Sequence, residues 1–250
     1  MCNNMFTKPK HLYHFISRIE KIEQSLIPQD PIQNFLYYNF KFNKDGHYGG
    51  EYHELRMRRI EKVLEVLGTE HKGKRILDLG GGLGDTGAFF AELGAEVTLA
   101  DGRLTNLNIA QLRFPKLICK HINAELPFGH LGKFDVIMCF AFLEVIKDIG
   151  NVVKCMKEMT DTIILETTVT DSDEIKNYEY AMPARNDSSI IGIGSKPSPA
   201  YIEMLFRDWN IDRYKENLDT DNDCYSWKPR NDGSSKRDNK HLRRFWVFTK

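Results

Sequence analysis

The segment from Arg75 to Arg103, RILDLGGGLGDTGAFFAELGAEVTLADGR, constrains the fold of this chain more than any other. A short apolar run leads into a glycine-rich turn, a helical pattern follows, and a second apolar run ends at Asp101. Glycine permits a sharp turn from strand to helix and lets a ligand approach the backbone without a Cβ in the way. The free N–H groups at the start of a helix attract an anionic group. The segment therefore predicts a strand–helix–strand unit that binds a nucleotide-like ligand at its first turn.

The rest of the chain repeats this alternation. Apolar runs predict strands at 75–79, 96–100, 117–122, 134–140 and 162–167, and later at 211–218 and 243–249. Apolar residues at helical spacing predict helices at 84–93, 104–112 and 149–159, and at 199–209 after a Ser198 N-cap. Such alternation builds a largely parallel sheet with right-handed crossovers. The pattern weakens after Thr168, so the polar stretch 170–196 predicts no regular element, and the polar stretch 219–240 is expected to be a loop.

Two helices are predicted before the first strand. Apolar residues recur at helical spacing in 11–27 and in 51–68, and an aromatic-rich link, 34–52, joins the two helices. The basic stretches 55–62 and 240–244 are interpreted as a solvated helix face and a strand end, because runs of charge usually face solvent.

The composition argues against several classes of function. Lys plus Arg and Asp plus Glu both number 35, a balance that disfavours nucleic acid or an anionic membrane surface as partner. Five cysteines without a CxxC pair, and eight histidines without an HxH or HExxH pattern, predict reduced thiols and no metal site. The start of the sequence has no apolar core of a signal peptide, and the longest apolar run is too short to cross a bilayer. We therefore expect a cytoplasmic protein.

The glycine loop matches two kinds of nucleotide site. Residues 82–87, GLGDTG, formally fit the GxGxxG pattern of dinucleotide-binding proteins. In that pattern the first glycine closes the strand, so the motif would begin at Gly80 and require a glycine at 85, where Asp85 stands. The register therefore argues against a dinucleotide, although an oxidoreductase remains an alternative.

The same loop, with Asp78 two residues before its first glycine, resembles the DxGxGxG loop of Rossmann-like S-adenosylmethionine (SAM)-dependent methyltransferases. The resemblance covers about residues 50–168, and FDVIMCFAFLEVI (134–146) is similar to the family's fourth motif. It implies an α/β fold: a Rossmann-like, doubly wound, mostly parallel seven-stranded sheet with one antiparallel strand near the C-terminus, plus N-terminal helices. It also implies SAM as cofactor and S-adenosylhomocysteine as product.

The resemblance further implies a set of cofactor contacts. Asp78 would hold the methionine end, Asp101 the ribose hydroxyls, and Asn123 would border the adenine. The complete predicted set comprises Tyr52, Asp78, Gly80, Gly81, Gly82, Gly84, Asp101, Gly102, Arg103, Asn123, Ala124 and Phe140. The domain division implied is an N-terminal cap, 1–50, and a methyltransferase domain, 51–250, with substrate-facing insertions at 170–200 and 219–240.

The sequence identifies the reaction and the methyl acceptor less clearly than the cofactor. The methyl group of SAM is already activated, so the protein need only align a nucleophile and, for a hydroxyl, remove a proton. Many small-molecule members read LEH after the fourth motif, whereas this chain reads LEV, which leaves Glu144 and His53 as candidate bases. The C-terminal third resembles methyltransferases of bacterial glycan and natural-product assembly, with a polar and aromatic pocket expected from Tyr225, Trp227, Arg244 and Trp246.

These features predict methylation of a small polar acceptor, such as a saccharide hydroxyl. Methylation of RNA or protein is an alternative, and so is a SAM-binding module without catalysis.

Overall fold

The computed structural model describes residues 51–68, 71–182, 189–214 and 242–250. The chain divides into two compact units, Met1–Glu54 and Leu55–Lys250. In the first unit, the described residues form the start of helix α3 (Glu51–Leu67). The predicted helix at 11–27, most of the aromatic link and the 1–50 cap lie outside the described residues.

The second unit alternates strands and helices as the sequence predicts. Its first half contains, in chain order, β1 (Arg75–Leu79), α4 (Asp85–Glu92), β2 (Glu96–Asp101), α5 (Leu104–Arg113), β3 (Ile118–His121), η1 (Gly129–Leu131), β4 (Val136–Phe140), η2 (Leu143–Val145), α6 (Ile149–Met159) and β5 (Thr162–Thr168). Its second half contains β6 (Asn177–Ala181), β7 (Ile193–Pro197), α7 (Pro199–Leu205), β8 (Asn210–Arg213) and β9 (Arg243–Thr249).

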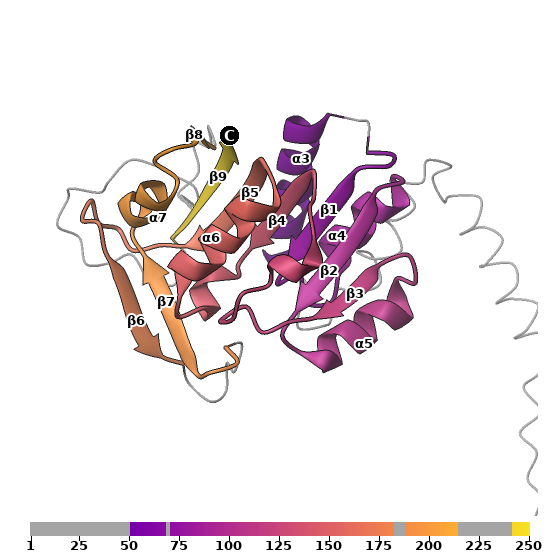
Figure 1. Cartoon of the computed structure of the whole chain (residues 1–250), viewed down its shortest axis with the longest axis horizontal. Coiled ribbons are helices and arrows are strands. Elements are labelled where there is room, and N and C mark those ends of the chain that lie inside the picture. The colour runs from indigo at the N-terminus through magenta and orange to yellow at the C-terminus, as the bar shows by residue number, and fades with distance from the viewer. Residues whose placement is uncertain (1–50, 69–70, 183–188, 215–241) are drawn as a thin grey trace, which may run out of the picture. The chain divides into compact units, whose positions relative to one another are not determined.

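The main sheet has seven strands in the order β3-β2-β1-β4-β5-β9-β8 (Figure 1). The pairs among β3, β2, β1, β4 and β5 are parallel, and β9 runs antiparallel to both of its neighbours, β5 and β8. The predicted fold, a mostly parallel seven-stranded sheet with one antiparallel strand near the C-terminus, is confirmed.

Successive side chains of a strand point to opposite faces of the sheet, so the residues of the central strands pack alternately on one face and on the other. On one face, strand residues pack with α6 and α7 into a single core that includes Leu77, Leu79, Ile137, Cys139, Ile163, Leu165, Val152, Met156, Ile202 and Phe206. On the other face, Asp78 meets α4 at Gly87 and Glu166 meets α3 at Arg59. The sheet is thus covered by helices on both faces, which leaves its strand ends as the place for a ligand.

The segment after β5 departs from the prediction. The stretch 170–196, for which no regular element is predicted, contains most of an antiparallel hairpin in which Asn177 pairs with Pro197 and Ala181 with Ile193. Every β6 residue except the first is exposed, so β6 lacks the alternating pattern that identifies a half-buried strand. The Ser198 N-cap is confirmed, since its side chain accepts a hydrogen bond from the Tyr201 N–H at 3.1 Å. The loop 219–240 lies outside the described residues.

Among the described residues, the helices lack the combination of length and apolar composition needed to cross a membrane.

Candidate active site

The strand order reverses beside β1, which lies between β2 on one side and β4 on the other. In open α/β sheets the crevice outside the carboxyl ends of the strands at such a switch point is the usual ligand site. Here the loops that follow β1, β2 and β4 meet at this place.

The glycine loop after β1 turns sharply and is open on one side. Gly80, Gly82 and Gly84 have φ values of 70°, 59° and 80°, in the left-handed region that favours glycine. The Gly80 N–H donates to the Ala100 carbonyl at 2.8 Å, which ties the loop to β2. A Cβ built on Gly82 would meet nothing within 4 Å. The loop therefore has a free side over which a ligand can lie against the backbone.

Asp101, at the end of β2, lies against this loop. Its Oδ2 accepts from the Gly82 N–H at 3.1 Å, and its Oδ1 accepts from the Arg103 N–H at 2.8 Å and the Asn106 side-chain amide at 3.2 Å. Each carboxylate oxygen can accept two hydrogen bonds, so Oδ2 has room for a further donor. The carboxylate is thus held in position and can accept a hydroxyl of a ligand.

Asp78 is buried beneath the loop. Its Oδ2 accepts from the Gly87 N–H at 3.0 Å, and a Cβ on Gly81 or Gly87 would come within 2.5 Å or 2.8 Å of the same oxygen. Burial raises the pKa of Asp78 to about 7, while the Gly87 hydrogen bond and the charge of Arg59 act in the opposite direction. These contacts show that Asp78 joins α4 to the glycine loop.

Replacing Asp78 is expected to change how stability depends on pH. Between about pH 4 and pH 7 the folded protein retains a proton that the unfolded chain has released, so stability falls as pH rises through this interval, by at most about 1.4 kcal/mol per pH unit. Asp78→Asn keeps the acceptor for Gly87 without ionising. We expect the difference in unfolding free energy between Asp78→Asn and the parent to shift in favour of the variant from pH 5 to pH 8. Urea unfolding at both pH values measures this difference. Asp161→Asn, at an exposed acid, serves as control. Parallel pH curves for parent and Asp78→Asn would contradict the raised pKa.

The loop after β4 brings an aromatic ring to the glycines. Ala141 has a φ of 51°, a left-handed conformation that is strained for any residue with a Cβ. This bend places Phe142 against Gly80, where a built Cβ would lie only 2.1 Å from the Phe142 Cδ2. Phe140, which the sequence predicts as a cofactor contact, stands just before this bend. The Phe140 ring is buried, 5.5 Å from the Arg59 guanidinium carbon and 5.7 Å from the Phe245 ring.

The loops after β2 and β3 place the other predicted residues nearby. The Gly102 carbonyl lies 3.1 Å from Nε2 of His121 at the end of β3. Asn123 is exposed, and its side-chain oxygen accepts from the Glu125 N–H at 3.1 Å, whereas Ala124 is buried. The structure thus brings the predicted residues after β1, β2 and β3 to one edge of the sheet.

Glu144, a candidate base, is held in an ion pair. Its Oε1 accepts from Arg243 at 3.2 Å, and its Oε2 accepts from the backbone N–H of Thr168 at 3.0 Å and from the Thr168 hydroxyl. Burial raises the pKa of Glu144, but Arg243 and the hydrogen bonds from Thr168 outweigh burial, so the pKa lies below its usual value. A carboxylate with these partners is a weak base, and the geometry favours a structural role.

The partner of Glu144 belongs to a larger buried cluster. Glu166 on β5 is fully buried and accepts from Arg59 Nε at 2.8 Å and from Arg243 Nη1 at 2.8 Å. The interpretation of 55–62 and 240–244 as solvated segments is therefore wrong for Arg59 and Arg243, whose side chains are both 13% exposed. One sign of these ion pairs is present in the sequence. Glu166 lies in the strand TIILETT, and a carboxylate buried in a strand needs a cationic partner.

The remaining candidates are not brought into the site by the described structure. Tyr52 and His53 lie at the start of α3, and their side chains fall outside the described part. Trp246 is fully buried and Arg244 is 3% exposed, so the expected sugar pocket is wrong at these two positions, while Tyr225 and Trp227 are not described. Across the described ranges, His, Cys, Asp and Glu side chains form no group that could hold a metal ion.

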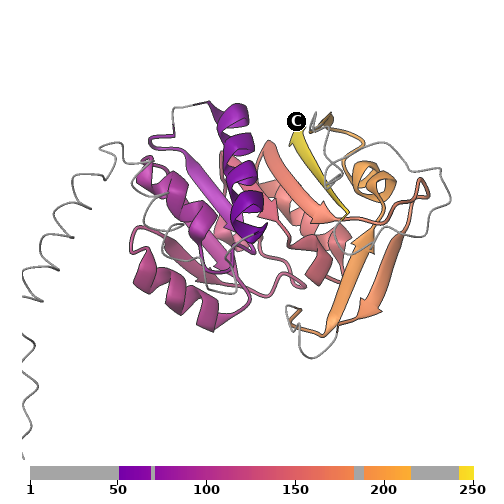
Figure 2. The same ribbon diagram turned by 180° about the vertical axis from the view of Figure 1, so that it is seen from behind.

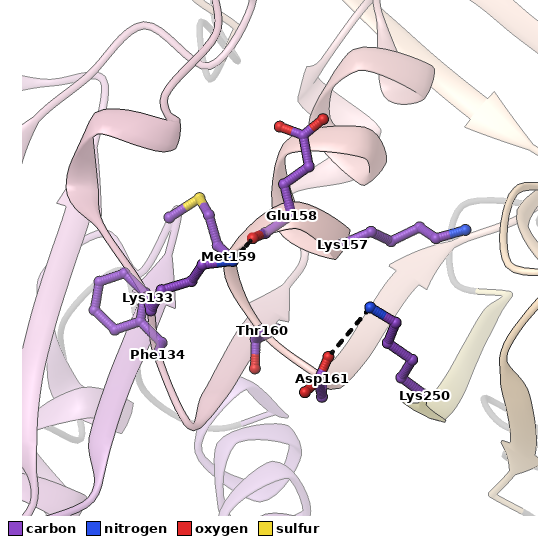
Figure 3. Close-up of a pocket in the computed structure, with 8 residues that line it drawn as sticks. All are labelled: Lys133, Phe134, Lys157, Glu158, Met159, Thr160, Asp161 and Lys250. Carbon is purple, nitrogen blue, oxygen red and sulfur yellow. Dashed lines mark hydrogen bonds and ion pairs between the residues drawn. The ribbon is translucent and has the colours of Figure 1, made fainter.

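A cavity of about 620 Å³ lies elsewhere, at the opposite edge of the sheet (Figure 3). Its lining includes Phe134 before β4, Asp161 before β5 and Lys250 after β9, all at the amino ends of the parallel strands. A nucleotide is expected at the carboxyl ends, beside Asp101 and the glycine loop. The candidate site is therefore formed by the loops after β1, β2 and β4 and not by this cavity.

Known proteins share both sequence and fold with this chain. Residues 52–242 match a family described as "Methyltransferase domain". The ubiquinone biosynthesis O-methyltransferase of Bordetella avium (strain 197N) is 31% identical over 107 residues, which cover 41% of this chain and 44% of that protein. The enzyme of the same name from Psychrobacter arcticus is 32% identical over 136 residues, covering 46% and 53%. The chain thus spans about half the length of the curated relatives it matches.

Two solved structures illustrate the shared fold. The N-terminal domain of EvdMO1, crystallised with S-adenosylhomocysteine, is 16% identical with a TM-score of 0.60, covering 80% of this chain and 85% of that one. The magnesium protoporphyrin IX methyltransferase of Synechocystis PCC 6803, with bound SAM, is 14% identical with a TM-score of 0.55, covering 89% and 98%. At these identities the likeness shows the fold alone.

Proposed function

This chain belongs to the methyltransferase-domain family, and from that premise we propose that it transfers a methyl group from SAM to a hydroxyl of a small polar acceptor. The observation that carries the proposal is the pairing of the open glycine loop with Asp101, whose carboxylate lies 3.1 Å from the Gly82 N–H. This arrangement suits a nucleoside whose hydroxyls bind the carboxylate while the rest lies along the loop.

The residues present fit SAM in three respects. Gly82 leaves the side of the loop open, Asp101 offers an acceptor to the ribose, and Asn123 stands exposed where the adenine edge would lie. Phe142 contacts Gly80 at the other end of the loop, toward the acceptor side. SAM, when bound, supplies an activated methyl group. The protein's part is to align the acceptor oxygen with that group and to exclude water, steps that need positioned walls rather than a strong base.

The acceptor side is proposed to be formed by the β6–β7 hairpin. A Cβ on Gly194 of β7 would lie 2.9 Å from the Glu144 carbonyl and 2.7 Å from the Tyr180 ring, so the hairpin packs on the loop after β4. Tyr178 and Tyr180 are 37% and 43% exposed, which leaves part of each side chain accessible to a polar acceptor although Lys176 lies over the Tyr178 ring. A saccharide fits such a surface, and the names of the curated relatives support oxygen as the acceptor atom.

The first test is calorimetric titration of the full chain with S-adenosylhomocysteine, with NAD in parallel. We expect micromolar affinity for the first and no binding of NAD. Binding of NAD alone would overturn the cofactor assignment and favour an oxidoreductase. Transfer of a labelled methyl group to a panel of saccharides and phenols then identifies the acceptor class.

The alternatives give different results in the same assays. Transfer to RNA that falls steeply with added salt would indicate a nucleic-acid substrate. Tight binding of S-adenosylhomocysteine with no transfer to small molecules, RNA or protein would indicate a binding module without catalysis.

A further inference from the structure

The connection between β6 and β7 reaches the end of β2. A Cβ built on Gly102 would lie 2.3 Å from Cδ1 and 3.0 Å from Cγ1 of Ile190. The isoleucine therefore occupies the space that a side chain at position 102 would fill. Gly102 is not among the glycines with positive φ, so backbone conformation does not require a glycine there. The absence of a side chain at position 102 is instead what gives Ile190 its place there.

Both sides of this contact are fixed by hydrogen bonds. Ser189, which is buried, donates from its hydroxyl to the Ile193 carbonyl at 2.7 Å, and the Met182 N–H donates to the Gly192 carbonyl at 2.9 Å. On the β2 side, the His121 ring contacts the Gly102 carbonyl. The position of Ile190 is thus built into the fold. Figures 1 and 2 show the hairpin on the side of the sheet toward which the parallel strands point.

Ile190 still has apolar surface to offer, because it is 50% exposed. Its neighbour Gly102 directly follows Asp101, the proposed ribose-binding residue. A base attached to a ribose at Asp101 must lie within a few ångströms of these residues, and its flat face is largely apolar. Packing such a face on an aliphatic side chain removes apolar surface of both from water.

We propose that Ile190 forms an apolar wall of the adenosine site, supplying from the hairpin the side chain that Gly102 lacks. The inference rests on the proposed use of SAM. It assigns to the insertion after β5, whose tyrosines face the acceptor side, a second role in binding the cofactor.

The test measures affinity by calorimetry for S-adenosylhomocysteine and for 5′-methylthioadenosine, which lacks the amino-acid tail. Ile190→Ala is expected to weaken both by the same factor, about five- to tenfold, because roughly half of an isoleucine side chain is lost from the contact. Ile175→Ala, at another exposed isoleucine just before β6, is the matched control and should leave both affinities unchanged. Thermal unfolding verifies that each variant is folded.

A double variant tests whether a side chain at position 102 can replace that of Ile190. Gly102→Val in the Ile190→Ala background restores an apolar group from the β2 side and is expected to recover most of the lost affinity. A double variant no better than Ile190→Ala would overturn the inference, and so would an unchanged affinity in Ile190→Ala or a loss confined to S-adenosylhomocysteine. If the parent protein itself binds neither ligand, the proposed function fails instead.

Discussion

Glu166→Gln is expected to lower the free energy of unfolding by about 3–5 kcal/mol, the usual cost of removing one partner from a buried ion pair. Glu166 is fully buried and joins Arg59 of α3 to Arg243 of β9. Its loss removes the counter-charge that the two guanidinium groups share, while Arg243 keeps its ion pair with Glu144. For a domain of this size the melting temperature should fall by roughly 10 °C, since each kcal/mol corresponds to about 2–4 °C.

Two comparisons make this prediction specific. Asp161→Asn removes an exposed ion pair to Lys250, at 3.8 Å, and should cost less than about 1 kcal/mol. Arg59→Met combined with Glu166→Leu removes charge of both signs from the cluster, so it should cost less than Glu166→Gln alone. Equal losses in Glu166→Gln and Asp161→Asn would show that the cluster is not the desolvated unit that the structure indicates.

Asp101→Ala is expected to weaken binding of S-adenosylhomocysteine about 100-fold. Two hydroxyl groups bonded to a carboxylate contribute about 1.5 kcal/mol or more each, and 1.4 kcal/mol corresponds to a tenfold change in affinity. The variant also loses the acceptor that holds Gly82 and Arg103 in place. Asp101→Asn keeps one acceptor oxygen, so a loss of about tenfold is expected. Calorimetry measures both, and an unchanged affinity in Asp101→Ala would remove Asp101 from the ribose site.

The sequence predicted the centre of the sheet well because four of its parallel strands, β1, β2, β4 and β5, are buried on both faces. The strands at 75–79 and 243–249 have the predicted bounds, and β2, β3, β4 and β5 differ from theirs by one or two residues at an end. The β6–β7 hairpin was missed because β6 is almost wholly exposed, and an exposed strand shows no alternation of apolar and polar residues.

The site was predictable where the backbone defines it and not where distant segments supply side chains. The glycine loop and Asp101 lie together as their positions at the ends of β1 and β2 require. Phe142 reaches the loop because Ala141 adopts a left-handed conformation. Alanine rarely does so, and the sequence therefore gives no sign of this bend. Ile190 and Arg243 come from segments far along the chain, and only the three-dimensional structure shows that they approach Gly102 and Glu166.

The position of β9 bears on how the chain folds during its synthesis. β9 leaves the ribosome after the other strands of the main sheet, yet it lies between β5 and β8, which emerge earlier. Until it arrives, β8 has no neighbouring strand to join, the free edge of β5 is exposed, and Glu166 lacks Arg243. An unpaired strand edge is a site of aggregation. The sheet is therefore completed, and Glu166 gains its second arginine, only once β9 has been made.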